Sequence, residues 1–339
     1  MRRVTARKVC KMATIYYDKD ADLGVLKGKK ICVVGYGIQG RAQSLCLRDS
    51  GADVVVGLIK DPTWDQAVRD KMNVRPVPEA VKGADIIMML IPDQLQKMVY
   101  EKDILPNMKK GAAIDFAHGF NIRFKRIVPP ADSDVIMVAP KGPGKLVRTT
   151  FEEGFGVPAL VAVEQDASKS ALKIGLAIAK ALGATRAGVI RTTFKEETET
   201  DLFGEQVDLC GGCSQMVKNS FETLVEAGYQ PEIAYFEVLH ELKLIVDLVQ
   251  AGGIENMWRN VSNTAEYGGR TRGPVIMDSG VKKRMKKALK DIQSGKFADE
   301  WMSEFEAGLP NLKRMREEGA KEQVETVGAD IRKMFTKKS

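Results

Sequence analysis

A glycine-rich turn between an apolar run and a helical pattern limits this chain to one kind of N-terminal fold. The run Lys30–Val34 leads directly into the turn at 35–40, a helical pattern follows to residue 50, and a second apolar run covers 53–57. In such a strand–turn–helix–strand unit the glycines permit a tight turn, close approach to a pyrophosphate and close packing of helix on strand. The helix N-terminus then faces the phosphates. The pattern predicts a Rossmann-type dinucleotide site at Gly35, Tyr36, Gly37, Ile38, Gln39 and Gly40.

The hydrophobic pattern changes near residue 192. Before it, apolar runs alternate with helical patterns, and the runs are continuous, as expected of parallel strands covered on both faces. After it, the pattern is almost wholly helical. We therefore expect an α/β fold with a doubly wound parallel sheet at 12–192 and an all-α domain at 193–339. The expected strands beyond the first unit are 84–91, 111–116, 134–138, 158–163 and 188–193; the expected helices are 200–209, 214–227, 231–251, 253–267, 274–294 and 297–307, with one more near the C-terminus.

Composition excludes several classes of protein. No apolar run reaches the ~18 residues of a membrane span, and 6% aromatic residues argue against a stacking platform for nucleic acid. Five of the seven net positive charges lie in residues 1–11, which carry no acid. We interpret them as a disordered basic extension, with Met12 as the natural start. We expect a small-molecule substrate and neither a nucleic-acid nor a membrane partner.

The cysteines indicate a reducing compartment. Their number, five, is odd, and two of them lie in apolar segments, which favours free thiols in a cytoplasm. Cys210 and Cys213 have the C-x-x-C spacing of a zinc or redox pair, but a zinc site needs a second ligand pair and the chain has only two histidines. We do not expect a zinc site.

Two acidic pairs mark the helical half. Asp201 and Glu205 stand four residues apart, as do Glu237 and Glu241, so each pair shares one helix face. Two converging carboxylate pairs would suit a pair of hard cations such as Mg²⁺. Taken alone, each pair is more often a solvated helix face.

The loop after the second strand leaves the nucleotide open. Asp61 could bind the ribose hydroxyls of NAD, whereas Lys60 and Thr63 could hold the 2′-phosphate of NADP.

Six motifs in this order and spacing resemble those of ketol-acid reductoisomerases of the short, class I form, from about residue 12 to the C-terminal region. The motifs are the turn at 35–40, Phe116-Ala-His-Gly-Phe120, Ala139-Pro-Lys-Gly-Pro-Gly144, the acidic stretch 193–206, the Glu237/Glu241 helix and Ser262-Asn-Thr-Ala-Glu-Tyr-Gly268. The resemblance implies Mg²⁺-dependent alkyl migration in a 2-acetohydroxy acid, then reduction by NADPH or NADH to a 2,3-dihydroxy acid, in branched-chain amino-acid biosynthesis. It also implies a knotted helical domain.

The resemblance also implies roles for individual residues. The metal ligands for two Mg²⁺ are Asp201, Glu205, Glu237 and Glu241, the second pair coming from the partner subunit of a homodimer that could assemble further. Glu241 also serves proton transfer and substrate binding, Ser262 contacts the substrate, and His118 and Lys141 are catalytic. The cofactor contacts beyond the glycine turn are Lys60, Asp61, Thr63, Asp93, Gln94, Leu95, Gln96 and Gly144. His240 is interpreted as structural.

Two positions depart from the family pattern. Lys145 replaces the usual histidine after the 139–144 motif, and Ile59 replaces an arginine in the loop that binds the 2′-phosphate. With Asp61 in the same shortened loop, the sequence predicts use of NADH as well as, or in preference to, NADPH.

Two other functions fit parts of the sequence. One is a hydroxy-acid dehydrogenase that needs no metal, and the other is a dinucleotide-sensing dimer without turnover. Neither has a use for two acidic pairs suited to hard cations.

Overall fold

The computed structural model describes residues 12–335. The predicted extension at 1–11 lies outside the described residues. The chain divides into two compact units, 1–198 and 199–339. Their border falls inside helix α9 (Phe194–Gly204), a few residues beyond the change at 192 in the hydrophobic pattern.

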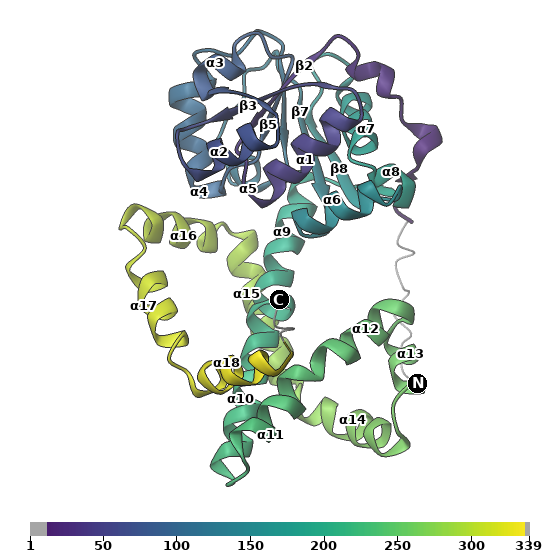
Figure 1. Ribbon diagram of the computed structural model, residues 1–339, viewed down its shortest axis with the longest axis vertical. Coiled ribbons are helices and arrows are strands. Elements are labelled where there is room, and N and C mark those ends of the chain that lie inside the picture. The colour runs from purple at the N-terminus through teal and green to yellow at the C-terminus, as the bar shows by residue number, and fades with distance from the viewer. Residues whose placement is uncertain (1–11, 336–339) are drawn as a thin grey trace, which may run out of the picture. The chain divides into compact units, whose positions relative to one another are not determined.

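The first unit contains a nine-stranded sheet in the order β1-β9-β8-β7-β6-β5-β2-β3-β4 (Figure 1). Strands β2 to β7 are mutually parallel, β8 pairs antiparallel with β7, β9 runs parallel to β8, and β1 pairs antiparallel with β9. The strands are β1 (Ile15–Tyr16), β2 (Lys30–Val34), β3 (Asp53–Leu58), β4 (Asn73–Pro76), β5 (Ile86–Met89), β6 (Ala113–Phe116), β7 (Val135–Pro140), β8 (Ala159–Gln165) and β9 (Val189–Arg191).

The predicted Rossmann-type α/β fold is confirmed, but its sheet is mixed and not wholly parallel. Strand β8 has an antiparallel neighbour in β7, yet its consecutive residues Val161 and Ala162, which point to opposite faces of the sheet, are both buried. A continuous apolar run reports burial on both faces and carries no information on strand direction. The sequence therefore located β8 and β9 correctly and their direction wrongly.

Helices cover both faces of this sheet. One buried cluster joins the sheet to α1 and α7, and the other joins it to α3, α5 and the first turn of α9. Each fully buried aliphatic side chain in such a core stabilises the fold by about 1.5–3 kcal/mol. The helices of this unit are α1 (Ile38–Asp49), α2 (Pro62–Arg69), α3 (Val77–Val81), α4 (Asp93–Val99), α5 (Phe120–Arg123), α6 (Gly144–Glu152), α7 (Ala171–Ala181) and α8 (Ala184–Ala187), with a π turn η3 (Tyr100–Ile104) and 3₁₀ turns η1 (Asp18–Asp20) and η2 (Leu23–Leu26).

The second unit is helical throughout its described part. It contains α10 (Gly211–Glu226), α11 (Pro231–Tyr235), α12 (Leu242–Gly252), α13 (Ile254–Arg259), α14 (Asn263–Ile276), α15 (Ser279–Gln293), α16 (Lys296–Glu306), α17 (Pro310–Gly319) and α18 (Gln323–Phe335), with π turns η4 (Glu205–Leu209) and η5 (Phe236–His240). A small core joins α10, α11 and α18 around Phe221, Tyr235 and Ile331. Gly328 allows this approach, because a Cβ there would lie 2.4 Å from the Tyr235 ring.

Several helix boundaries differ from the sequence-based ones. The expected helix 200–209 begins at Phe194, and the expected helix 231–251 is interrupted by the π turn η5. The expected helix 253–267 is broken before Ser262, whose hydroxyl caps α14 by accepting a hydrogen bond from Ala265 N. Pro274 lies inside α14 and does not begin a helix; α15 begins after Asp278, which accepts bonds from two backbone N–H groups. The C-terminal region holds two helices, α17 and α18, in place of one.

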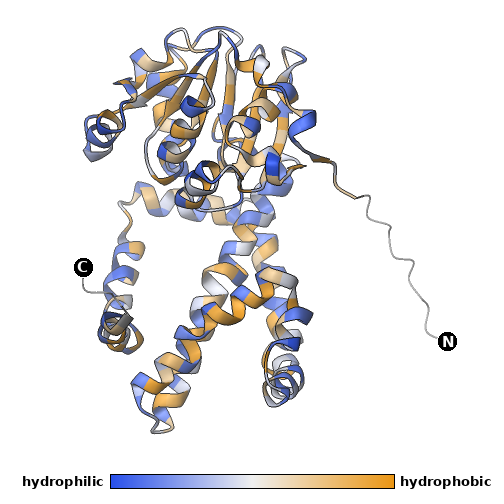
Figure 2. Ribbon diagram, turned by 45° about the vertical axis from the view of Figure 1, so that its right-hand side comes forward, coloured by the Kyte–Doolittle hydropathy of each residue, from blue (hydrophilic) through white to orange (hydrophobic). Residues whose placement is uncertain are grey.

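Much apolar surface of the second unit is left uncovered by the other residues within 12–335. No residue of α12, α13 or α14 is buried, although α12 reads Leu-Lys-Leu-Ile-Val-Asp-Leu-Val. Figure 2 shows apolar residues gathered inside the sheet unit and also along helices of the helical unit. No helix within residues 12–335 is long and apolar enough to cross a membrane.

Candidate functional site

The glycine turn has the backbone that a dinucleotide site requires. Gly35 has φ 105°, and a Cβ on it would lie 2.6 Å from Leu90 O. A Cβ on Gly40 would lie 2.3 Å from Gly35 O, so the third glycine lets α1 begin directly above the turn. No side chain caps the N-terminus of α1. Its first N–H groups are therefore available to an anion, which the helix dipole also favours.

Tyr36 contributes to this turn in a way that the sequence did not indicate. Its side chain is buried, and its hydroxyl donates to Asp70 Oδ2 at 3.0 Å. Arg41 binds both oxygens of the same carboxylate, at 2.6 and 3.0 Å, and its hydrogen bond is the main reason why the pKa of Asp70 falls to about 2. The Tyr36 side chain thus ties the glycine turn to the segment after α2.

The turn between β7 and α6 packs against the glycine turn. A Cβ on Gly144 would lie 2.0 Å from Ile38 O, and Gln39 Nε2 donates to Gly142 O at 2.9 Å. Two predicted cofactor segments thereby meet at one edge of the sheet. They border a cleft of about 780 Å³ that runs between α1 and α6 and also contacts Lys145.

The loop after β3 carries one acidic and one basic side chain, Asp61 and Lys60. Asp61 caps α2, accepting bonds from Thr63 N at 2.8 Å and from the Thr63 hydroxyl at 2.6 Å. That hydroxyl bond is the first cause of a lowered pKa for Asp61, so the exposed carboxyl is ionised at neutral pH. Lys60 lies 6.0 Å from the centre of the Trp64 ring. The hydroxyl hydrogen of Thr63 is thus engaged by Asp61 in this structure, and a carboxylate occupies the loop.

Three side chains meet where β6 and β7 end and α9 begins. Glu197, whose side chain is 1% exposed, lies with Oε2 3.1 Å from His118 Nδ1 and with Oε1 3.0 Å from Lys141 Nζ. Its Oε2 also accepts a hydrogen bond from Gly119 N at 3.1 Å. Burial acts to raise the pKa of Glu197, but the bond to His118 and the charges of His118 and Lys141 outweigh it and hold that pKa below its ordinary value. The cluster is therefore a buried carboxylate between two cation-forming groups.

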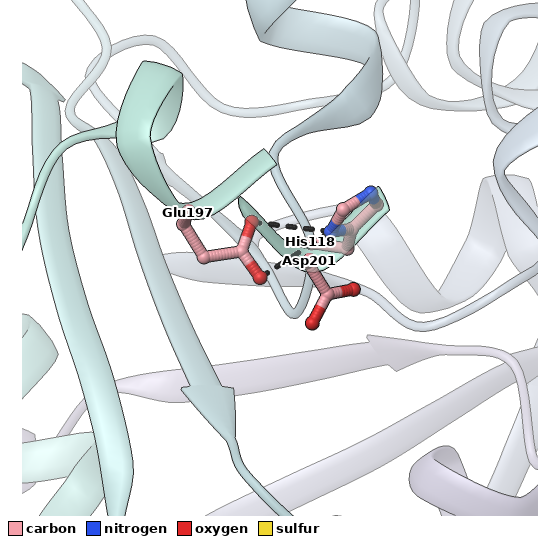
Figure 3. Close-up of side chains that lie close together, drawn as sticks. All are labelled: His118, Glu197 and Asp201. Carbon is pink, nitrogen blue, oxygen red and sulfur yellow. Dashed lines mark hydrogen bonds and ion pairs between the residues drawn. The ribbon is translucent and has the colours of Figure 1, made fainter. Parts of the chain in front are cut away.

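The sequence did not single out Glu197, although it singled out both of its partners. Glu197 stands four residues before Asp201, as Asp201 stands before Glu205, so the three acids follow one stripe of a helix. That spacing was a usable signal. Asp201 extends the cluster along α9, and one ligand atom from each of His118, Glu197 and Asp201 lies within 4.8 Å of the others (Figure 3).

The other predicted site residues lie elsewhere in the second unit. Glu205 is the first residue of the π turn η4, Glu237 lies in the π turn η5, and Glu241 follows η5 directly. Ser262 is the N-cap of α14. Within residues 12–335, His118, Glu197 and Asp201 form the one group of three or more potential metal ligands, and it includes none of these four residues. Their roles stay predictions.

The fold and this edge of the sheet define a class of protein. A glycine turn built for a pyrophosphate, an ionised carboxylate in the loop after β3 and a buried acid–base cluster at the same edge are the parts of a nicotinamide-dependent oxidoreductase.

Comparison with known proteins gives the family. Residues 25–188 match "acetohydroxy acid isomeroreductase, NADPH-binding domain", and residues 194–337 match "ketol-acid reductoisomerase, C-terminal domain". A ketol-acid reductoisomerase (NADP(+)) of Pyrobaculum calidifontis is 57% identical over 325 residues, which are 96% of this chain and 99% of the relative. The chain belongs to the ketol-acid reductoisomerase family, and it is an NAD(P)H-dependent enzyme that combines isomerisation with reduction.

Solved structures agree with this assignment. The structure of an NADH-preferring ketol-acid reductoisomerase from an uncultured archaeon is 51% identical, with a TM-score of 0.93, and the match covers 96% of this chain and 100% of that one. A semialdehyde dehydrogenase NAD-binding protein from Cupriavidus necator is 16% identical with a TM-score of 0.60, covering 78% of this chain and 99% of that one. The second match concerns the fold alone.

Proposed function

We propose that this enzyme converts 2-acetohydroxy acids, such as 2-acetolactate and 2-aceto-2-hydroxybutyrate, to 2,3-dihydroxy acids in valine, leucine and isoleucine biosynthesis. An alkyl group migrates first, and the resulting 2-keto acid is then reduced. The observation that carries the proposal is the Glu197 cluster, which holds His118 and Lys141 at the sheet edge that also bears the dinucleotide turn. One edge then serves both steps.

The donor set at the end of α9 and the start of η4 fits Mg²⁺. Asp201 and Glu205 offer carboxylate oxygens, which are the ligands that hard cations prefer. Bound there, two Mg²⁺ ions would polarise the substrate carbonyl and stabilise negative charge on oxygen. In the chain itself, Glu197 keeps the Lys141 ammonium and the His118 ring oriented. We assign proton transfer to Glu241 and a substrate contact to Ser262.

We further propose a homodimer in which Glu237 and Glu241 complete the partner's site. The exposed apolar surface of α12 supports it: Leu244 and Val246 are 56% and 51% exposed on a helix without one buried residue. Apolar faces of this kind are stabilised when a second subunit covers them. Within the described part of the second unit, Glu237 and Glu241 do not join Asp201 in a ligand group, which fits their use in another subunit.

For the cofactor, we propose that NADH is used at least as well as NADPH. The two close relatives are named for different nucleotides, one NADP(+) and one NADH-preferring. In this chain the ionised Asp61 would accept hydrogen bonds from ribose hydroxyls and repel a 2′-phosphate.

The test is cofactor oxidation by purified protein with 2-acetolactate, with NADH and NADPH in parallel, with and without Mg²⁺. We expect Mg²⁺-dependent turnover and kcat/KM values for the two cofactors within about tenfold. A hundredfold preference for NADPH would contradict the cofactor proposal. Turnover of a hydroxy acid after chelation would favour a metal-independent dehydrogenase, and tight nucleotide binding without turnover would favour a sensor.

A further inference from the structure

A buried amide joins two turns at the cofactor edge of the sheet. Asn121 lies in α5, three residues after His118, and its side chain is 0% exposed. Its Nδ2 donates to Asp93 O at 2.9 Å and to Gln96 Oε1 at 2.9 Å. Asp93 and Gln96 belong to the first turn of α4, which follows β5, so Asn121 links the turn that begins α5 after β6 to the turn that begins α4 after β5.

Both ends of this link are fixed by other hydrogen bonds. Gln96, which is 4% exposed, donates through Nε2 to Ile91 O at 3.0 Å and to Asp93 Oδ1 at 3.3 Å. The backbone carbonyl of Asn121 accepts hydrogen bonds from Arg126 N at 2.8 Å and Ile127 N at 3.1 Å, which fixes the chain after α5. Asn121 therefore cannot shift without moving both turns.

The link continues to the acid–base cluster. Gly119, two residues before Asn121, donates its N–H to Glu197, and Glu197 contacts Lys141 in the turn after β7. Together with the backbone from Gly119 to Asn121, these hydrogen bonds connect the turns that follow β5, β6 and β7. Those turns lie at the carboxyl ends of adjacent parallel strands, which is where an α/β sheet binds its ligand.

We propose that Asn121 is a positioning residue that sets the spacing between the Asp93–Gln96 turn and the His118 turn, and thereby fixes the nicotinamide cofactor for hydride transfer. The inference deepens the proposed reduction and rests on it. Asn121 itself touches no reacting atom, because its side chain is enclosed by the two turns. Its carboxylate isostere could not reproduce the link, since both partners of Nδ2 are oxygen acceptors.

The test compares Asn121→Leu with a matched variant at the opposite edge of the sheet, Gln165→Met. Gln165 resembles Asn121 in that its amide nitrogen makes two hydrogen bonds: Nε2 donates to Pro130 O at 2.7 Å and to Ser133 O. Each substitution replaces an amide by an apolar side chain of similar size. The first measurement is the Kd of NADH and of NADPH, obtained from nucleotide fluorescence. The second is the kinetic isotope effect on reduction of the 2-keto intermediate, with a cofactor deuterated at the position of the transferred hydride.

For Asn121→Leu we expect Kd to rise about tenfold, the effect of roughly one lost buried hydrogen bond, and the isotope effect to increase. Gln165→Met should lower the melting temperature comparably and leave both quantities unchanged. If the leucine variant does not fold, Asn121→Ser removes the same bonds without apolar bulk and decides the question. Unchanged Kd and isotope effect in a folded Asn121 variant would overturn the proposal. A wild-type enzyme that binds nucleotide but does not reduce the keto acid would instead count against the proposed function, since Kd is measured without turnover.

Discussion

Replacing Glu197 by glutamine should separate the chemistry of the cluster from its packing. Glutamine keeps the shape of the side chain but removes the charge, and its amide nitrogen would face either Lys141 Nζ or His118 Nδ1, both now 3.0–3.1 Å from a carboxylate oxygen. Hydrogen bonds to charged groups contribute about 1.5–3 kcal/mol each. Loss of one to two such bonds would weaken the interactions that orient Lys141 and His118 by roughly 3 kcal/mol. We expect the transition state to lose the same stabilisation, so kcat should fall by about a hundredfold.

The assay is steady-state kinetics at saturating Mg²⁺ and cofactor, with Glu196→Gln as the matched control. Glu196 lies on the same helix turn but is exposed, and its carboxylate accepts from the Thr192 hydroxyl at 2.8 Å. The control should keep kcat within about twofold, as surface changes usually do. If Glu197→Gln also retained kcat within that range, Glu197 would not orient the cluster.

The same variant has a pH signature in stability. The pKa of folded Glu197 lies below its ordinary value of 4.5, so its ionised form stabilises the fold at neutral pH. This contribution is present above pH 4.5 and is lost as the pH falls through the lowered pKa. Thermal unfolding of Glu197→Gln should therefore depend less on pH on the acid side than that of the wild type.

Three further outcomes follow from the structure. Burial raises the pKa of Asp115 well above its ordinary value, so the stability of the fold falls as the pH rises towards that raised pKa. Asp115→Asn should therefore raise the melting temperature by about 2–8 °C at pH 8 and by less at pH 4, as measured by calorimetry. Asp61→Ser keeps a helix N-cap but removes the charge, and should shift the NADPH/NADH ratio of kcat/KM about tenfold towards NADPH; an unchanged ratio would exclude Asp61 as the selective group. Leu244→Lys places a charge on the apolar surface of α12 and should yield monomers in sedimentation, whereas the exposed Lys243→Glu should not.

Much of the first unit could be predicted because its signals are local. The glycine turn, the buried strands and the turns that follow them are each encoded within a few residues, and Gly35 and Gly40 show the steric need for glycine directly. Strand direction was not predictable, because the centre of β8 is apolar and buried on both faces, as a parallel strand would be. The Tyr36–Asp70 hydrogen bond joins residues 34 positions apart, and no local sequence pattern predicts it.

At the candidate site, the sequence identified individual residues better than it identified the residues that contact them. His118 and Lys141 were expected from motifs, but the carboxylate that holds them, Glu197, lies 79 and 56 residues further along the chain. Only the fold brings those segments together. The helical half was harder still, because within residues 12–335 helices such as α12 have no fully buried residue. Helix ends in this half depend on caps such as Ser262 rather than on a packed face.

The π turns at the two acidic pairs have an evolutionary consequence. In the described part of the second unit, η4 begins at Glu205 and η5 contains Glu237, and each is closed by a bond from residue i+5 to residue i, Cys210 N to Glu205 O and Glu241 N to Phe236 O. A π turn amounts to one residue inserted into an α-helix, and it is rare except at functional sites. Deleting one residue from either turn would restore a regular helix and rotate every later side chain by about a quarter of a turn. With the metal roles proposed for the two acidic pairs, the straighter helix would turn the later carboxylates away from their proposed site, so selection for helix stability alone would act against the spacing found in these two segments.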